Sequence, residues 1–224
     1  MMTKRIITII LTLCVTSLSA QTSDWGVRAG FEAEKKLNKK WEVGLGGEYR
    51  WKDGMSLTDQ VRGSLVAGYK PWKFLKIGAG YELIADKKKK KDIFIYRHRF
   101  KIDATGIHKF RRFTASWRPR LQITAYDEDE VDEDEPDNYR WVLRNRLGLN
   151  YNIPKTPLKP YIQIEIYNRV FSNPDYYKNR FSTGLEYTIT KNHEIDLGYK
   201  RDSENTNGEK SYFDVLAVKY KYSF

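Results

Sequence analysis

The chain has 224 residues, a formal net charge of +11 and 14% aromatic residues. Its mean hydropathy of −0.69 excludes a bundle of membrane-spanning helices, because each such helix needs about 20 predominantly apolar residues in succession. The length suits a single all-β domain. The 16 Tyr, 10 Phe and 6 Trp are typical of β-barrels with aromatic belts at the membrane surfaces.

Residues 1–20 have the layout of a secretory signal peptide. Lys4 and Arg5 form a positively charged start, an apolar stretch over 6–15 follows, and small residues lead to Ala20. The apolar stretch is too short to span a membrane. We therefore expect export, with cleavage after Ala20 or one residue earlier.

The mature domain is then expected over 21–224. Loss of Lys4 and Arg5 lowers the net charge from +11 to +9. Because the single cysteine, Cys14, lies in the removed segment, we expect neither disulfides nor thiol chemistry. A basic chain could bind nucleic acid, but an exported chain does not meet it, so we predict no nucleic-acid partner.

Nearly every segment of the mature chain alternates between apolar and polar residues, which predicts strands. Ile162, Ile164 and Ile166 fall on one face, for example, while Gln163 and Glu165 fall on the other. A helix cannot separate these sets, because its repeat is 3.6 residues. Eleven such runs lie near 25–35, 41–51, 57–70, 74–86, 92–107, 111–126, 138–153, 160–171, 179–190, 193–202 and 211–224.

The lengths of these runs and of the connections between them indicate a transmembrane barrel. Many runs exceed the roughly 9–11 residues that a tilted strand needs to cross a bilayer. Short connections alternate with longer, more charged ones, as periplasmic turns alternate with outer loops. Because single-chain bacterial barrels have an even number of strands, we expect ten or twelve. The predicted fold class is all-β, a single antiparallel up-and-down transmembrane β-barrel of 10–12 strands.

The last strand ends on an aromatic residue. Apolar residues occupy alternate positions up to Tyr222 and Phe224, and this ending resembles the assembly signal of outer-membrane barrels. A soluble, lipocalin-like barrel, with apolar residues inside and polar residues outside, is the alternative fold. Alternation does not say which face is inside, but the strand length, Phe224 and the aromatic content favour the membrane.

Six loose sequence patterns support a family resemblance that covers the whole mature chain. They are Gln21-Thr22-Ser23-Asp24-Trp25-Gly26, Glu34-Lys35-Lys36-Leu37-Asn38-Lys39-Lys40-Trp41, Leu57-Thr58-Asp59-Gln60, Tyr96-Arg97-His98-Arg99-Phe100, Leu143-Arg144-Asn145-Arg146-Leu147 and Gly184-Leu185-Glu186-Tyr187. The chain resembles a family of small outer-membrane β-barrels of unknown function from Gram-negative bacteria of the Bacteroidetes type. The resemblance implies a barrel and the cell outer membrane as its location, and it implies no reaction.

For such a barrel we expect a monomer that has outer-membrane lipid, the barrel-assembly machinery and periplasmic chaperones as its partners. Charged residues should fill its lumen, and basic residues on adjacent strands, about 4.8 Å apart, should form one wall. The predicted basic wall consists of Arg97, Arg99, Arg118, Arg120, Arg144 and Arg146. The predicted acidic lumen residues are Glu48, Glu82, Glu165 and Glu186.

Three functions are compatible with this arrangement. The first is a structural or interaction barrel, whose lumen is filled by an Arg–Glu network. The alternative is a small channel or binder for anionic solutes. The third, a lipid-modifying barrel enzyme, would need a catalytic partner for His98, which lies on the outward face without an outward Ser on the neighbouring strands. We predict no catalytic residues and no enzymatic activity.

Two charge runs are expected in the outer loops. Residues 127–137 contain nine acidic residues, and 87–91 are five consecutive lysines. We interpret both as solvated charge runs, with mutual docking or divalent-cation binding as alternatives. Because the acidic spacing does not match an EF-hand loop, we predict no metal site and no cofactor.

Overall fold

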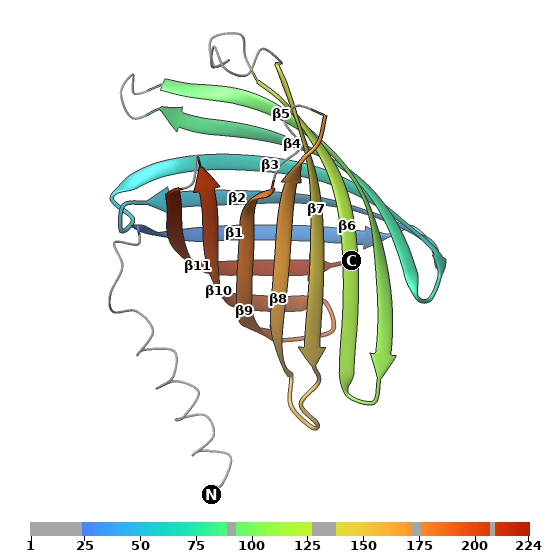
Figure 1. The fold of residues 1–224 in the computed structure, drawn as a ribbon. Coiled ribbons are helices and arrows are strands. Elements are labelled where there is room, and N and C mark those ends of the chain that lie inside the picture. The colour runs from blue at the N-terminus through green and yellow to red at the C-terminus, as the bar shows by residue number, and fades with distance from the viewer. Residues whose placement is uncertain (1–23, 89–92, 127–137, 172–175, 207–208) are drawn as a thin grey trace, which may run out of the picture.

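The computed structural model describes residues 24–88, 93–126, 138–171, 176–206 and 209–224. They form a closed barrel of tilted strands (Figure 1). Among the described residues, no helix is long and apolar enough to cross a membrane. The strands are β1 (Asp24–Lys36), β2 (Trp41–Lys52), β3 (Leu57–Trp72), β4 (Leu75–Lys88), β5 (Ile93–Phe110), β6 (Phe113–Ala125), β7 (Tyr139–Tyr151), β8 (Leu158–Arg169), β9 (Tyr176–Thr188), β10 (His193–Thr206) and β11 (Glu209–Ser223).

The strand count corrects one expectation. The described residues form eleven strands, which match the eleven alternating runs and lie within the predicted 10–12, but they contradict the narrower expectation of an even number. With an odd number of strands in an up-and-down chain, the first and last strands run in the same direction. β1 and β11 therefore close the barrel in parallel, from Asp24 beside Phe213 to Glu34 beside Ser223. The expectation of an entirely antiparallel sheet is wrong at this seam, while sequence-adjacent strands pair antiparallel.

The large apolar side chains face outward. On β8, Ile164 is 53% exposed whereas the neighbouring Glu165 is 3% exposed. The same alternation leaves Leu147 on β7 and Ile102 on β5 exposed. This arrangement is the reverse of a lipocalin-like barrel, whose apolar residues lie inside.

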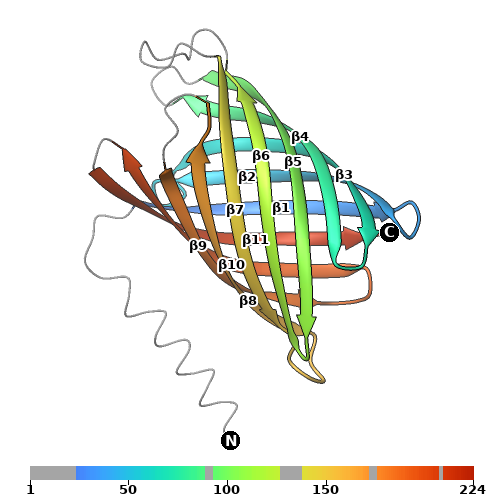
Figure 2. The same cartoon turned by 45° about the vertical axis from the view of Figure 1, so that its right-hand side comes forward.

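The strands run between two ends of the barrel (Figure 2). One end, here called the turn end, carries the connections 37–40, 73–74, 111–112, 152–157 and 189–192. The opposite end is called the loop end. Outward aromatic side chains gather near both ends, as the belts of a membrane barrel do. At the turn end they include Trp41 against Tyr69, with ring centroids 4.7 Å apart, and Phe113 against Tyr151, at 4.9 Å.

The aromatic C-terminus belongs to the turn-end belt. The rings of Tyr222 and Phe224 meet edge to face, with centroids 4.5 Å apart. The backbone N–H of Phe224 donates to the carbonyl oxygen of Glu34, 2.9 Å away on the other side of the parallel seam. The residues predicted to be an assembly signal therefore also complete the closure of the barrel, while their recognition by assembly machinery stays a prediction.

Candidate functional site

The lumen contains a cavity of about 1040 Å³. Its lining follows β2 from Glu42, the second residue of the strand, to Lys52, the last. Among the lining residues sixteen are Arg or Lys and nine are Asp or Glu, an excess of seven positive side chains. The cavity thus extends along nearly the full length of a strand and is strongly basic.

The pairing of the strands places the charges in two neighbouring rows that run around the wall, here called the charge belt. Strand register determines the rows, because residues paired across adjacent strands point to the same face. The first row is Asp103, Arg120, Arg144, Tyr167, Lys178 and Glu204. The second row is Arg118, Arg146, Glu165, Arg180 and Asp202.

Four arginines of the belt form two like-charged pairs between β6 and β7. Arg120 lies directly opposite Arg144, and Arg118 lies directly opposite Arg146. We call these residues the arginine tetrad. Like charges directly opposite one another destabilise a sheet, so the tetrad depends on carboxylates from the neighbouring strands.

Glu165 on β8 is shared by three of these arginines. Its Oε1 accepts from Arg144 Nη2 at 2.9 Å and from Arg146 Nε at 3.2 Å, and Arg118 Nη2 lies 4.0 Å away. The hydroxyl of Tyr167 donates to its other oxygen at 2.7 Å. One carboxylate is therefore shared by three guanidinium groups, so the positive charges around Glu165 exceed the negative charge by two.

Asp103 on β5 holds the fourth arginine. Its Oδ2 accepts from Arg120 Nε at 2.9 Å and from Arg120 Nη2 at 2.7 Å. The residue beside Asp103 on β4 is Gly78, and a Cβ at that position would lie 3.0 Å from the aspartate oxygen. Glycine at this position leaves room for the carboxylate to turn toward Arg120.

The ring of Tyr167 lies between several cations. The guanidinium carbon of Arg144 is 4.6 Å from the ring centroid, that of Arg180 is 5.6 Å away, and Lys178 Nζ is 5.8 Å away. These distances are within the range of cation–π attraction. The ring faces and hydroxyl of Tyr167 thus help to stabilise cations that outnumber the local carboxylates.

Asp202 on β10 repeats the sharing seen at Glu165. It is 2% exposed, accepts from Arg180 Nη2 at 2.6 Å and forms an ion pair with Lys178 Nζ at 2.9 Å. Arg28 Nη2, from β1 across the closing strands, is 3.7 Å away. Lys178 also bonds Glu204, so two carboxylates face three cations here and the positive excess is one charge.

Two donors of the tetrad lack partners. The Nε–H groups of Arg118 and Arg144 are buried and make no hydrogen bond within the described part of the chain. Buried polar groups are normally satisfied. The tetrad therefore combines an excess of positive charge, which suits an anion in the cavity, with two unpaired donors that are buried away from the cavity surface.

Several glycines on β2 to β4 line the cavity, and their positions within strands agree with the sequence pattern. They are Gly44 and Gly46 on β2, Gly68 on β3, and Gly78 and Gly80 on β4. A Cβ at Gly68 would lie 2.9 Å from Glu42 and Lys76, and one at Gly80 would lie 3.2 Å from Lys101. These glycines therefore make room for long charged side chains of the neighbouring strands.

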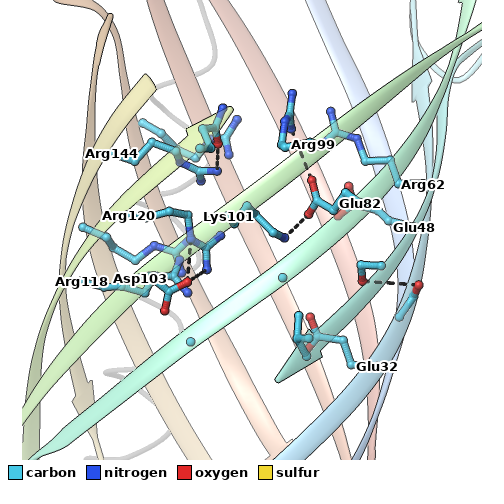
Figure 3. Close-up of a pocket in the computed structure, with 18 of the residues that line it drawn as sticks. Glu32, Glu48, Arg62, Glu82, Arg99, Lys101, Asp103, Arg118, Arg120 and Arg144 are labelled. Atoms are coloured by element: carbon cyan, nitrogen blue, oxygen red, sulfur yellow. Dashed lines mark hydrogen bonds and ion pairs between the residues drawn. The ribbon is translucent and has the colours of Figure 1, made fainter. Parts of the chain in front are cut away.

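The structure brings most of the predicted lumen residues together. Arg99, Arg118, Arg120, Arg144 and Arg146 line the cavity. Figure 3 shows Arg118, Arg120 and Arg144 on one side of it, and Glu48 and Glu82 on the other. Arg62 and Arg99 are drawn beside Glu48 and Glu82, so that second side holds charges of both signs and includes one residue of the predicted basic wall.

Three predicted residues lie elsewhere or are bound differently. Arg97 is absent from the cavity lining, and its Nη1 is 2.6 Å from Asp86 Oδ2. Glu165 lies behind the lining, among its arginines. Glu186 lies nearer the turn end, with Lys221 Nζ 3.6 Å from its Oε1.

On the side of the cavity that contains Glu48 and Glu82, each carboxylate has its own cation. Glu82 accepts from Lys101, and Arg99 Nη1 is 3.4 Å from its Oε2. Arg50 pairs with Glu48 on the same strand. Arg99 also donates from Nε to the Thr124 hydroxyl at 2.9 Å. Each of these carboxylates has a nearby cation, but Arg50, Arg62, Arg99 and Lys101 outnumber them, so this side shares the positive excess of the belt.

Sequence reasoning missed Arg180 and Asp202. Both alternate correctly to be inward, but only the register of β8, β9 and β10 shows that Arg180 lies beside Glu165 and Asp202. No group of three or more His, Cys, Asp or Glu among the described residues could hold a metal ion. The acidic run over 127–137 lies outside the described residues, as do Lys89 to Lys91 of the basic run.

The family described as a protein of unknown function, DUF2490, matches residues 29–213. The chain belongs to this family. The match confirms the resemblance predicted from the sequence patterns, to a family of barrels without an assigned reaction. The chain matches no curated protein.

Solved structures that align with this chain include a porin, the β domain of an autotransporter and a protein expressed in the outer membrane. The NanC porin aligns with a TM-score of 0.53 at 13% identity, covering 83% of this chain and 92% of the porin. The β domain of the Bordetella autotransporter BrkA aligns at 0.48 and 13% identity, covering 90% and 99%. OmpT of Vibrio cholerae aligns at 0.43 and 13% identity, covering 81% and 59%. The likeness to the NanC porin shows that the DUF2490 barrel shares its fold.

Proposed function

We propose that this DUF2490 barrel lies in the outer membrane and admits small anionic solutes into its lumen, where the charge belt binds them. The observation that supports this most strongly is the arginine tetrad, in which Arg120 faces Arg144 and Arg118 faces Arg146. This was the second hypothesis from the sequence, after a filled structural lumen. The geometry of the belt supports it better.

A purely structural network would place opposite charges across each strand pair. The belt does this between β9 and β10, where Arg180 lies opposite Asp202 and Lys178 opposite Glu204. It does the reverse between β6 and β7. An anion between the tetrad arginines would lower their mutual repulsion, and in a confined lumen this gain exceeds its value in bulk water.

The shape of the cavity supports entry of a solute. Lining residues extend to both ends of β2, so the same cavity reaches toward the turn end and the loop end. Long arginine side chains narrow the space, which limits the solute to a small one. Rings and walls of basic side chains select anions in membrane pores.

Reversal potentials measured in planar bilayers test the proposal. We expect the purified barrel to conduct and to favour chloride over potassium. The double variant Arg118→Gln, Arg146→Gln should lower this preference roughly tenfold, because losing two nearby charges changes the energy of an ion by on the order of 1–2 kcal/mol. Arg112→Gln, in the exposed turn between β5 and β6, is the matched control and should leave selectivity unchanged.

The structural or interaction barrel is the competing function. The ion pairs around Glu48 and Glu82, such as Lys101 with Glu82, favour it. If the barrel gives no conductance steps, and liposomes that contain it take up no small organic anion, the result would support this alternative and contradict the entry of anions into the lumen.

The absence of enzymatic activity stays a prediction. His98 shares a hydrogen bond of 2.7 Å with Tyr81, and no Ser or Asp contact to it is seen among the described residues. Release of fatty acid from phospholipid vesicles by the purified barrel, with loss in His98→Ala, would contradict this prediction.

A further inference from the structure

The outward wall over β3, β4 and β5 carries an apolar groove of about 480 Å³. Small side chains, Ala67 and Ala79, form its floor, and they are paired across β3 and β4. Leu65, Phe100 and Ile102 form its sides and are 60%, 55% and 64% exposed. A groove of this composition in a membrane-facing wall matches an acyl chain in chemistry.

A column of outward side chains runs along the β4–β5 hairpin, and the groove lies at the end of this column that is farther from the loop end. Cross-strand pairs lead from it toward the loop end, and their character changes from apolar to charged along the way. In order, these pairs are Ala79 with Ile102, Tyr81 with Phe100, Leu83 with His98, Ala85 with Tyr96, and Lys87 with Phe94.

His98 and Tyr81 form a hydrogen-bonded pair next to the groove, on its loop-end side. Tyr81 also borders the groove, and its hydroxyl lies 2.7 Å from His98 Nδ1. When the tyrosine hydroxyl donates to Nδ1, the imidazole carries its proton on Nε2, which is then free to donate to a ligand. The remaining Nε2–H gives this face a hydrogen-bond donor among exposed apolar side chains, directly beside the groove.

Lys87 adds a positive charge at the loop end of the same column. Its Nζ lies 4.8 Å from the centroid of the Phe94 ring. The column therefore presents, in order, a cation, an imidazole donor and an apolar groove. A phospholipid presents the complementary sequence of phosphate, ester region and acyl chain.

We propose that this column is a binding site for a phosphate-bearing membrane lipid in the leaflet at the loop end. One acyl chain occupies the groove over Ala67 and Ala79, and the phosphate lies between His98 and Lys87. The site is independent of the lumen, since all of these side chains lie on the outward face.

Native mass spectrometry of the delipidated barrel in detergent tests this site, with phosphatidylglycerol and a diacylglycerol of the same chains as probes. We expect phosphatidylglycerol to bind and the diacylglycerol, which lacks the phosphate, to bind about tenfold more weakly, as expected for the loss of hydrogen bonds to a charged group. Lys87→Gln and His98→Ala should each reduce the preference for phosphatidylglycerol.

The groove is tested separately by filling it. Ala79→Leu should lower the binding of both probes, while Ala115→Leu, an exposed alanine on β6 outside the column, should not. Equal binding of the two probes to the wild-type barrel, or unchanged binding in both Ala79→Leu and His98→Ala, would overturn the proposal. Both alanine variants add the same apolar bulk, so their comparison controls for assembly.

Discussion

Two parts of the lumen differ in how their charged side chains are balanced and in how completely side chains fill the space. In the charge belt, cations outnumber carboxylates and face a cavity. Nearer the turn end, the hydroxyl of Tyr161 donates to Asp196 at 2.9 Å, and the ring packs over Gly184 and Gly198. We call this second part the filled region, because an aromatic side chain occupies the space that the two glycines leave.

The filled region also has the opposite charge balance. Lys221 Nζ is 2.8 Å from Glu194, 3.6 Å from Glu186 and 4.0 Å from Asp196. Here one cation serves several carboxylates, whereas in the belt one carboxylate serves several cations. Excess charge in this barrel therefore occurs in both signs, but only the positive excess borders the cavity, which points to the belt as the functional surface.

The largest expected effect is on the packing of the filled region. Tyr161→Ala should lower the free energy of unfolding by about 3 kcal/mol, because it empties a buried site whose glycine floor cannot fill the space. Urea titration in detergent micelles, followed by tryptophan fluorescence, measures it. Gln163→Ala on the same strand, which lines the cavity, should cost much less. Similar losses for the two would remove the distinction between filled and hollow parts.

A medium effect is expected from the shared carboxylate of the belt. Glu165→Gln should lower the free energy of unfolding by about 1.5–3 kcal/mol, since the arginines lose their negatively charged partner and the new amide NH2 cannot accept from the Tyr167 hydroxyl. It should also raise anion selectivity, because the belt gains one positive charge. The two changes have opposite signs, and reversal potentials together with unfolding curves detect them. A fall in both quantities would contradict a belt that binds anions.

The smallest effect is expected from the cation of the filled region. Lys221→Gln leaves carboxylates without their shared partner, but Lys221 is partly exposed and solvent screens the loss to about 1 kcal/mol or less. Anion selectivity should hardly change, because Lys221 is absent from the cavity lining. A shift in selectivity as large as that of Glu165→Gln would show that the two parts of the lumen act as one.

Alternation predicts faces well in this chain because the direction of a side chain in a strand follows residue parity. It identified the strands and the inward direction of residues such as Arg144 and Glu165. The eleven runs also equal the eleven strands, and the expectation of ten or twelve came from the rule that bacterial barrels have an even number of strands. The parallel seam follows from that count.

Partners across strands could not be predicted, because they depend on register. Arg97 and Arg99 have the same parity, yet Arg97 pairs with Asp86 outside the cavity while Arg99 lines it. Parity also has exceptions. Arg201 and Asp214 alternate outward, and they form a two-bond pair with both distances at 2.8 Å that neutralises them on the apolar face.

The parallel seam has a consequence for how the barrel is made. Lys219 on β11 bonds Glu32 on β1 at 2.8 Å, although 187 positions separate them along the chain. β1 must therefore wait, with one backbone edge unpaired, until almost the whole polypeptide has been delivered. Such an edge is a template for aggregation, and closures of long sequence separation are slow. The first strand is thus the segment most in need of protection during biogenesis, and a barrel truncated before β11 would keep a permanently adhesive edge.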